Sequence, residues 1–138
     1  MRYLLDTNVI SETRKRRPET KVIRWLETSS PDAHYLSVLT IGEIKKGIVQ
    51  HRRRDPAGAQ RLEHWLNGLR ELFAERILTV GDSEATCWGE LAGNSGLPVV
   101  DGLLAATALV HDLTLVTRNT KDFARIDVDL LDPWQDSD

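Results

Sequence analysis

The feature that most constrains this chain is the regular alternation of short apolar runs with longer segments of helical periodicity. The apolar runs lie at residues 3–5, 35–37, 77–80, 114–117 and 128–131. Short, continuous apolar runs are typical of strands that are buried on both faces of a parallel sheet. Because helical segments alternate with these runs, the sequence predicts an α/β fold with a central, mainly parallel sheet.

Most of the segments between the strands have apolar residues on one helical face, as Ile41, Ile44 and Ile48 do. Helices are expected at residues 20–28, 40–53, 56–73, from 82 or 83 to 95, and 102–111, with a short helical turn near 121–123. A chain of 138 residues suits a single domain and can bury a core. We therefore expect one domain over residues 1–138, in which residues 127–138 carry the last strand and an acidic tail.

The charge of the chain is unevenly distributed. Its 18 basic and 21 acidic residues give a formal net charge of −3, but residues 127–138 contain five Asp and no Lys or Arg. Without this segment, 18 basic residues stand against 16 acidic ones, a net charge of +2. Basic residues gather at 14–17, 45–46 and 52–54, runs that are typical either of a solvated face or of a surface that contacts phosphates. The acidic composition therefore does not exclude a nucleic-acid partner.

Composition also bears on the compartment. Cys87 is the single cysteine, so no internal disulfide can form. No apolar run approaches the roughly 20 residues that a membrane-spanning helix needs. The first strand follows Met1 and Arg2 directly, which leaves no room for a signal peptide. We expect a cytoplasmic protein with no membrane partner.

Acidic residues recur where predicted strands end or where the following helices begin. Asp6 follows the first strand, Glu43 lies near the start of the helix after the second, and Asp101 precedes a small-residue helix. Asn119 and Asp122 come shortly after a later strand. A parallel sheet brings the carboxyl ends of its strands to one edge, which is where ligands bind. We therefore expect these side chains to converge.

Each acid also has a local structural explanation. Asp6 and Asp101 are good helix N-caps. Glu43 can complete a capping box with Thr40, and Asp122 can interact favourably with the dipole of its own helix. Each explanation is reasonable alone, but the coincidence of all four acids at one sheet edge favours a functional site.

Carboxylates that converge repel one another, so a cation is needed to offset their charge. The four histidines are scattered, and no Cys or His group has the spacing of a zinc site. Oxygen ligands suit hard cations, so we expect Mg²⁺, for which Mn²⁺ can substitute. Mg²⁺ on carboxylates suits phosphate chemistry, in which one ion activates water and a second stabilises the leaving oxygen.

Four motifs, in this order and spacing, resemble those of the PIN-domain ribonucleases, and within them the VapC-like toxins of toxin–antitoxin systems. They are LDTNVISE at 5–12, SVLTIGEIKKG at 37–47, DGLLAATA at 101–108 and LVTRNTKDF at 115–123, with LDPW at 131–134. The resemblance covers nearly the whole chain. It implies a compact α/β/α sandwich and Mg²⁺-dependent endoribonuclease activity, in which metal-activated water hydrolyses RNA phosphodiester bonds.

The resemblance also implies roles for the acids. Asp6, Glu43 and Asp101 match the family's three metal-binding acids, and we expect Asp6 and Asp101 to ligate the metal directly. A fourth acidic position of many relatives falls on Asn119, which can ligate through its carbonyl but carries no charge. Asp122, in the same turn, is expected to supply the missing carboxylate as a fourth catalytic acid. Whether one metal or two are bound stays open.

Other positions are expected to support the site or to bind substrate. By the resemblance, the hydroxyls of Thr7 and Thr117 line the site and orient water or metal, and Asn8 supports the loop after the first strand. Three arginines near the acids in sequence are candidates for contacts with RNA phosphates: Arg14, Arg16 and Arg118. Arg118 can equally pair with a site carboxylate, and the basic run can be ordinary surface.

The resemblance further implies two protein partners, a second copy in a two-fold dimer and a cognate VapB-like antitoxin. The antitoxin's tail is expected near Trp25 and Ile44–Ile48, where a basic side chain can replace the metal among the acids. Four tryptophans suit such interfaces, although at least two are expected to pack in the core: Trp25, Trp65, Trp88 and Trp134. A structured RNA such as a tRNA loop is the expected type of target, but the sequence names neither the RNA nor the antitoxin.

Two other interpretations stay open. A catalytically inactive PIN fold that serves as an interaction module is permitted by Asn119, although the three intact acids argue against it. A phosphoaspartyl phosphatase of the haloacid-dehalogenase type needs a second Asp two residues after Asp6, where this chain has Asn8. A receiver domain needs a Lys after a late strand, where this chain has Arg118. Both phosphoaspartyl alternatives fit worse.

Overall fold

Five strands form one sheet in the order β3-β2-β1-β4-β5 in the computed structural model, which describes residues 1–135. Every neighbouring pair is parallel, and Tyr3 of β1 aligns with His34 of β2 on one side and Thr114 of β4 on the other. The strands are β1 Tyr3–Leu5, β2 His34–Ser37, β3 Ile77–Leu78, β4 Thr114–Val116 and β5 Leu130–Leu131. The predicted parallel α/β architecture is confirmed.

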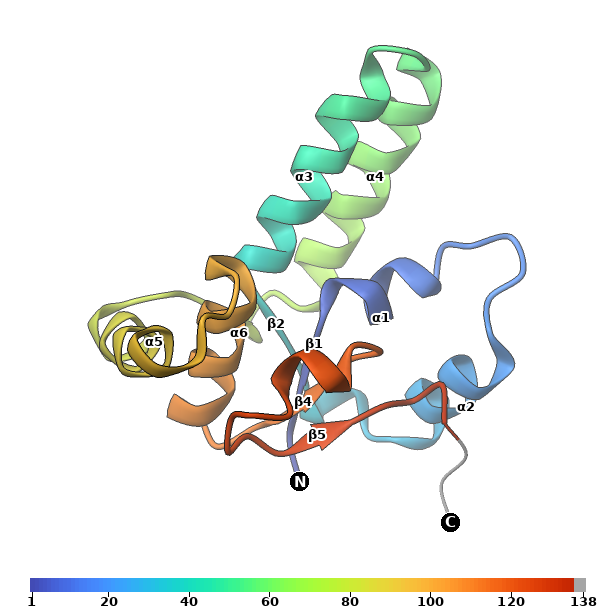
Figure 1. Ribbon diagram of the computed structural model, residues 1–138. Coiled ribbons are helices and arrows are strands. Elements are labelled where there is room, and N and C mark those ends of the chain that lie inside the picture. The colour runs from blue at the N-terminus through green and yellow to red at the C-terminus, as the bar shows by residue number, and fades with distance from the viewer. Residues whose placement is uncertain (136–138) are drawn as a thin grey trace.

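Six α-helices surround the sheet, and two of them form a projecting hairpin. The α-helices are α1 Thr7–Glu12, α2 Thr20–Thr28, α3 Val38–Arg52, α4 Pro56–Leu72, α5 Asp82–Ser95 and α6 Val99–Val110. Short 3-10 helices cover Pro31–Ala33 and Thr120–Phe123. Figure 1 shows α1 and α2 on one side of the sheet, α5 and α6 on the other, and α3 and α4 extending away from it side by side. We call the α3–α4 hairpin the arm.

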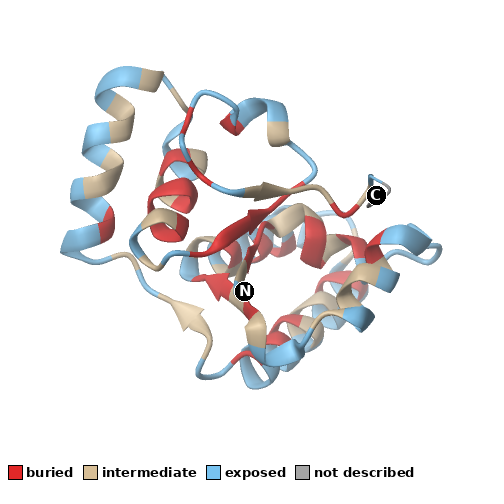
Figure 2. Cartoon of the chain, turned by 90° about the horizontal axis from the view of Figure 1, so that it is seen from below, coloured by how far each residue is buried: buried red, intermediate tan, exposed pale blue. Residues whose placement is uncertain are grey.

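The sheet is buried between two apolar clusters because adjacent residues of a strand point to opposite faces. Leu5 and Val116 belong to the cluster under α1 to α4, whereas Leu4 and Leu115 belong to the cluster under α6. Figure 2 shows burial concentrated on the central strands and on the inward faces of the helices. The two-sided core explains why the strands are continuous apolar runs in the sequence.

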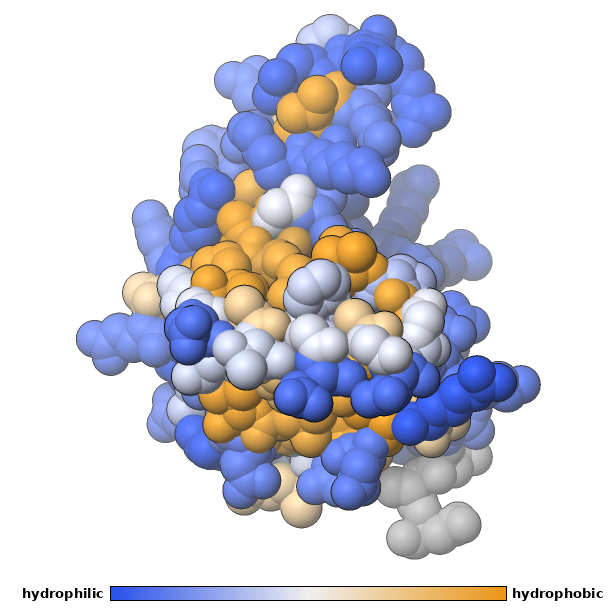
Figure 3. Space-filling view, turned by 60° about the vertical axis from the view of Figure 1, so that its left-hand side comes forward, coloured by the Kyte–Doolittle hydropathy of each residue, from blue (hydrophilic) through white to orange (hydrophobic). Residues whose placement is uncertain are grey.

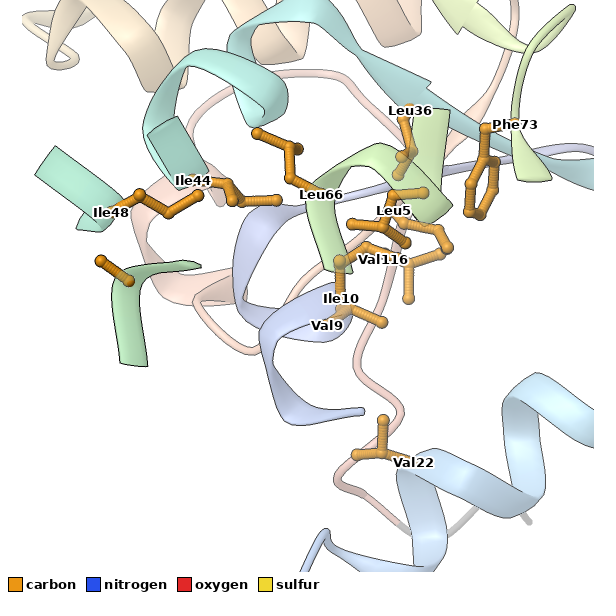
Figure 4. Packing of buried hydrophobic residues seen from close by; sticks show 12 residues of the cluster. Leu5, Val9, Ile10, Val22, Leu36, Ile44, Ile48, Leu66, Phe73 and Val116 are labelled. Carbon is orange, nitrogen blue, oxygen red and sulfur yellow. The ribbon is translucent and has the colours of Figure 1, made fainter. Parts of the chain in front are cut away.

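The arm is joined to the body by its own apolar seam. Ile44 and Ile48 of α3 lie opposite Leu66 of α4, in continuity with the side chains that cover the sheet (Figure 4). At the far end of the arm, Asp55 begins α4 by accepting a hydrogen bond from the backbone N–H of Gly58 at 3.0 Å. The arm is therefore held in place by packing at its base and by a helix cap at its tip.

Several boundaries differ from those that periodicity predicts. The helix α3 starts at Val38 rather than at residue 40, because the Ser37 hydroxyl accepts a hydrogen bond from the N–H of Leu39 and caps the helix there. Ladder pairing covers only Leu130–Leu131 of the strand expected at 128–131. Residues 136–138 of the expected acidic tail lie outside the described residues. No helix within residues 1–135 is both long and apolar enough to cross a membrane.

Candidate active site

Asp6 is the buried centre of the site and stands at the junction of β1 and α1. Its Oδ1 accepts the backbone N–H of Thr7 at 2.7 Å, which caps α1, and its Oδ2 accepts the Thr117 hydroxyl at 2.8 Å. The amide of Asn8 donates to the same Oδ2 at 3.4 Å. Burial raises the pKa of Asp6, and the charges of Glu43 and Asp101 raise it further, against the lowering effect of the Thr117 and Thr7 hydrogen bonds.

Glu43 reaches the site from the arm. The Thr7 hydroxyl donates to Glu43 Oε1 at 2.7 Å and lies 3.2 Å from the hydroxyl of buried Thr40. These contacts join the start of α1 to the base of α3. Glu43 itself is exposed, so its second carboxylate oxygen can meet a ligand.

Asp101 and Asp122 complete the acidic group from the other side. Burial raises the pKa of Asp101, and the charges of Asp122 and Glu43 raise it further. Asp101 is half-buried and Asp122 is exposed. Within residues 1–135, neither carboxylate makes a hydrogen bond or an ion pair, so both are available to a cation or a substrate.

The loop after β4 is organised by Thr117 rather than by Asn119. The Thr117 hydroxyl accepts the backbone N–H of Asn119 at 3.0 Å while it donates to Asp6. The backbone N–H of Arg118 donates to Asn8 Oδ1 at 3.4 Å, which ties this loop to α1. The side chain of Asn119 is exposed and makes no hydrogen bond within the described part of the chain. The predicted supporting residues Thr7, Asn8 and Thr117 are thus brought together around Asp6.

The donor set suits a hard divalent cation in its chemistry, because carboxylate and amide oxygens are available and no thiol or imidazole is nearby. No three Asp, Glu, His or Cys side chains within residues 1–135 are close enough together to form a ready-made metal site. Asp6 is fixed by three donors, whereas Asp101 and Asp122 are free to turn. The arrangement is therefore one anchored carboxylate facing others that can move toward a cation.

The local structural explanations of the acids have different outcomes. Asp6 is both a site residue and the N-cap of α1, so its two interpretations hold together. The N-cap of α6 is Pro98, and Asp101 lies within the first turn, so its expected capping role is wrong. The expected capping box of Thr40 with Glu43 is also wrong, because α3 already begins at Val38.

The arginines predicted to bind RNA are placed differently from one another. The Arg118 guanidinium lies over the Trp134 ring at 5.2 Å from its centroid, and Arg14 lies over Trp65 at 5.3 Å. Arg118 makes no ion pair with a site carboxylate within residues 1–135. Arg14 and Arg16 lie beyond the far end of α1, in the loop that Figure 1 shows extending away from the sheet. Of the three, Arg118 is the one next to the acids.

The four tryptophans all contact other parts of this chain. Trp25 stacks on His34 with centroids 5.4 Å apart, and its edge meets Tyr3. Trp65 lies under Arg14, and Trp134 lies under Arg118. Trp88 lies against the backbone of α6 at Gly102. Trp25 also lines a surface groove of about 640 Å³ between α2 and the segment after β5. Packing within the chain therefore accounts for much of the tryptophan content.

Two residues that the sequence analysis did not place at the site support its surroundings. Buried Thr40 contacts the Thr7 hydroxyl, and its signal was its position one helical turn before Glu43. Buried Glu12 accepts the backbone N–H of Glu19 at 2.8 Å and pairs with Lys15 at 2.8 Å. The contact with Lys15 lowers the pKa of Glu12. Glu12 thus secures the loop that leaves α1.

Comparisons with known proteins show the family to which the chain is related. The model of the PIN domain family matches residues 3–129. Toxin FitB of Neisseria gonorrhoeae is 34% identical over 140 residues, covering 96% of this chain and 99% of that protein. VapC ribonuclease Y4jK of Sinorhizobium fredii is 32% identical, covering 96% of this chain and 97% of that protein.

A solved structure shows the same arrangement of the chain. The structure of FitAB bound to an IR36 DNA fragment superimposes with a TM-score of 0.84 at 30% sequence identity, and the match covers 99% of this chain and 98% of that chain. The likeness extends over the sheet, the arm and the acidic edge, because almost no part of either chain is left out.

Proposed function

The chain belongs to the PIN-domain family, and from that premise we propose that it is a Mg²⁺-dependent endoribonuclease that acts as the toxin of a toxin–antitoxin system. The observation that carries the proposal is that Thr7 joins Asp6 to Glu43 by hydrogen bonds, while the charges of Glu43 and Asp101 help to raise the pKa of buried Asp6. Perturbed acids that share a cleft are typical of functional sites. The likeness to Toxin FitB and VapC ribonuclease Y4jK supports the same activity.

The chain's own residues suit the hydrolysis of a phosphodiester bond. Asp6 and Asp101 would hold Mg²⁺ directly, with Glu43 and Asp122 beside them and the Asn119 carbonyl within the same loop. When bound there, Mg²⁺ would lower the pKa of a water molecule that it holds and would stabilise negative charge on the phosphate oxygens. Thr117 and Thr7 fix the Asp6 carboxylate through hydrogen bonds of 2.8 and 2.7 Å. The carboxylate is therefore already oriented before a metal ion binds.

Glu43 is the residue best placed to handle a proton. Its Oε1 accepts the Thr7 hydroxyl, and the residue is exposed, so the other carboxylate oxygen is open to solvent and ligand. A carboxylate held in this way can accept a proton from the attacking water. We therefore assign Glu43 the role of general base and Asp122 that of an outer carboxylate in place of the uncharged Asn119.

We also propose two protein partners and a cytoplasmic location. Val38 and Val100 are exposed and line one groove, and Val99 beside them is 59% exposed. Figure 3 shows hydrophobic surface gathered where the arm meets the body. Exposed apolar patches mark interaction sites, which supports a homodimer that uses the most exposed of these residues, Val99 at the start of α6. A cognate antitoxin that inserts a cationic side chain among the acids would block both metal and RNA.

The activity can be tested with purified protein and a mixture of labelled RNAs. Wild-type protein should cleave RNA in Mg²⁺, and both EDTA and Asp6→Asn should reduce cleavage by about 10²-fold or more, the usual scale for an essential charged group. Asp32→Asn is the matched control, because Asp32 precedes β2 and lies at the opposite edge of the sheet. Its cleavage rate should equal that of wild type.

Calorimetry separates an active site from an inactive module. Mg²⁺ should bind to wild-type protein and to Asp32→Asn, and binding to Asp6→Asn should be lost. Full cleavage in EDTA or by Asp6→Asn would contradict the proposed activity. If the protein binds Mg²⁺ but cleaves no RNA, the proposed ribonuclease activity is also rejected, and the interaction module is the better interpretation.

A further inference from the structure

The cationic side chains of α3 and its cap divide into two sets. Lys45 and Arg52 face α4, where both pair with Glu63, the Arg52 contact measuring 3.5 Å. The other set consists of Lys46, Arg53 and Arg54, which are exposed. Within residues 1–135, no carboxylate lies within ion-pair distance of these three. Arm stability therefore explains the first set and leaves the second without a structural role.

The second set lies on the same helix face as the catalytic acid. Successive residues of an α-helix are rotated by about 100°, so Glu43, Lys46 and Gln50 form one stripe at i, i+3 and i+7. Arg53 and Arg54 continue it, because the backbone of Arg53 is still helical. At about 1.5 Å per residue, Arg54 lies roughly 16 Å along the axis from Glu43. A line of unpaired positive charge thus starts beside the acidic site and ends at the arm tip.

The start of this stripe is hollowed. A groove of about 540 Å³ is lined by Glu43, Lys46, Gln50 and neighbouring residues of α3, and Val100 of α6 forms its other wall. Gly42 and Gly47 also line it, and no atom lies within 4 Å of the position that a Cβ would take at either glycine. A chain that leaves the acids can therefore lie close to the α3 backbone.

We propose that the stripe of α3 beyond Glu43, comprising Lys46, Gln50, Arg53 and Arg54, is a track that binds the phosphate backbone of RNA beyond the point of cleavage. The track extends the proposed ribonuclease function and rests on it. The carboxylates of the proposed active site repel a polyanion where it must be cut. Unpaired cations along the departing strand offset this repulsion and favour binding, because each neutralised phosphate releases counterions. The track therefore favours an RNA long enough to reach the arm tip.

The experiment compares two double variants that remove equal charge from opposite faces of one helix. Arg53→Gln with Arg54→Gln removes the end of the track, and Lys45→Gln with Arg52→Gln removes the cations that pair with Glu63. Affinity for a long labelled RNA hairpin is measured in EDTA over a range of salt concentrations. Cleavage of the hairpin and of a trinucleotide is then measured in Mg²⁺, and circular dichroism confirms that each variant is folded.

The track variant should bind the hairpin on the order of tenfold more weakly, and its salt slope should fall by about 1.4, the value for two lost single-strand phosphate contacts. The paired-face control should match wild type in both measurements. Trinucleotide cleavage should be unchanged in the track variant, because a short substrate does not reach the tip. Hairpin cleavage should show a raised KM with kcat preserved.

Three results would overturn the track. Equal losses in both double variants would show a general effect of net charge, and unchanged hairpin binding in the track variant would remove the tip from the interface. Weaker binding of the antitoxin with unchanged RNA affinity would make this face a protein-docking surface. If no RNA is cleaved by wild type while the track variant alone loses affinity, the ribonuclease fails but the RNA-binding face stands.

Discussion

Replacing Gly102 by Ala tests the close packing that fixes the start of α6, where Asp101 is located. A Cβ at residue 102 would lie 2.9 Å from Cδ1 and 3.0 Å from Nε1 of Trp88. These distances are below ordinary van der Waals contact, so either the indole ring or α6 must shift. Gly89 on α5 is the matched control, because no atom lies within 4 Å of the position of its Cβ.

The two substitutions share one favourable effect and differ in one unfavourable effect. Ala in place of Gly inside a helix stabilises the folded state by about 1 kcal/mol at either position. Overpacking a buried contact costs about 1–3 kcal/mol and applies only at residue 102. Gly89→Ala should therefore raise the free energy of unfolding by about 1 kcal/mol, while Gly102→Ala should be between neutral and about 2 kcal/mol destabilising.

Urea unfolding followed by circular dichroism measures both variants against wild type. The difference between the two variants should be about 1–3 kcal/mol with unchanged m-values. Because Gly102 follows Asp101 directly, Gly102→Ala should also weaken Mg²⁺ binding, whereas Gly89→Ala should not. Equal stabilisation by both substitutions would refute the argument, since it would mean that α5 and α6 separate without cost.

Two further substitutions probe the surroundings of Asp6. Burial raises its pKa above 3.8, so the ionised carboxyl lowers the stability of the folded state at neutral pH and this penalty fades as the pH falls toward 3.8. Asp6→Asn should therefore unfold at a higher urea concentration than wild type at pH 7 and lose this advantage at pH 4; an advantage that grows on acidification would contradict the assignment. Thr117→Val should destabilise the protein by about 1–3 kcal/mol, because it removes the shorter hydrogen bond to Asp6 Oδ2 and leaves the N–H of Asn119 without its acceptor. Thr117→Ser keeps the hydroxyl and should retain most of the stability, and equal losses in both Thr117 variants would show that the methyl group matters instead.

The sequence predicts the parts of this structure that depend on local periodicity. Apolar runs locate the strands, because these strands are buried on both faces. Helical spacing gives α2 its correct bounds, because a surface helix buries one face. The position of Asp6 past a buried strand is enough to expect it at the ligand-binding edge of a parallel sheet. The same topology is the reason to expect Glu43 and Asp101 near this edge.

What the sequence does not reveal depends on contacts between distant segments or on competition between caps. Ser37 and Thr40 are both acceptable helix starts, and only the end of β2 at Ser37 decides between them. Arg14 lies over the Trp65 ring and Arg118 lies over the Trp134 ring. Neither pair is related by a regular interval in the sequence. No local pattern separates an arginine that reaches substrate from one that lies on an aromatic ring.

The double attachment of Asp6 has a consequence for the evolutionary history of such folds. A lineage that no longer cuts nucleic acid would still be selected to keep an acceptor at residue 6, as Asp or Asn, because an apolar side chain there leaves the Thr7 N–H and the Thr117 hydroxyl without an acceptor. The fold does not depend on Asp101 and Asp122 in this way, since their side chains make no hydrogen bond or ion pair within residues 1–135. Relaxed selection should therefore erase these two first. Their presence in a genome's copy of the fold is the better record of an activity still in use.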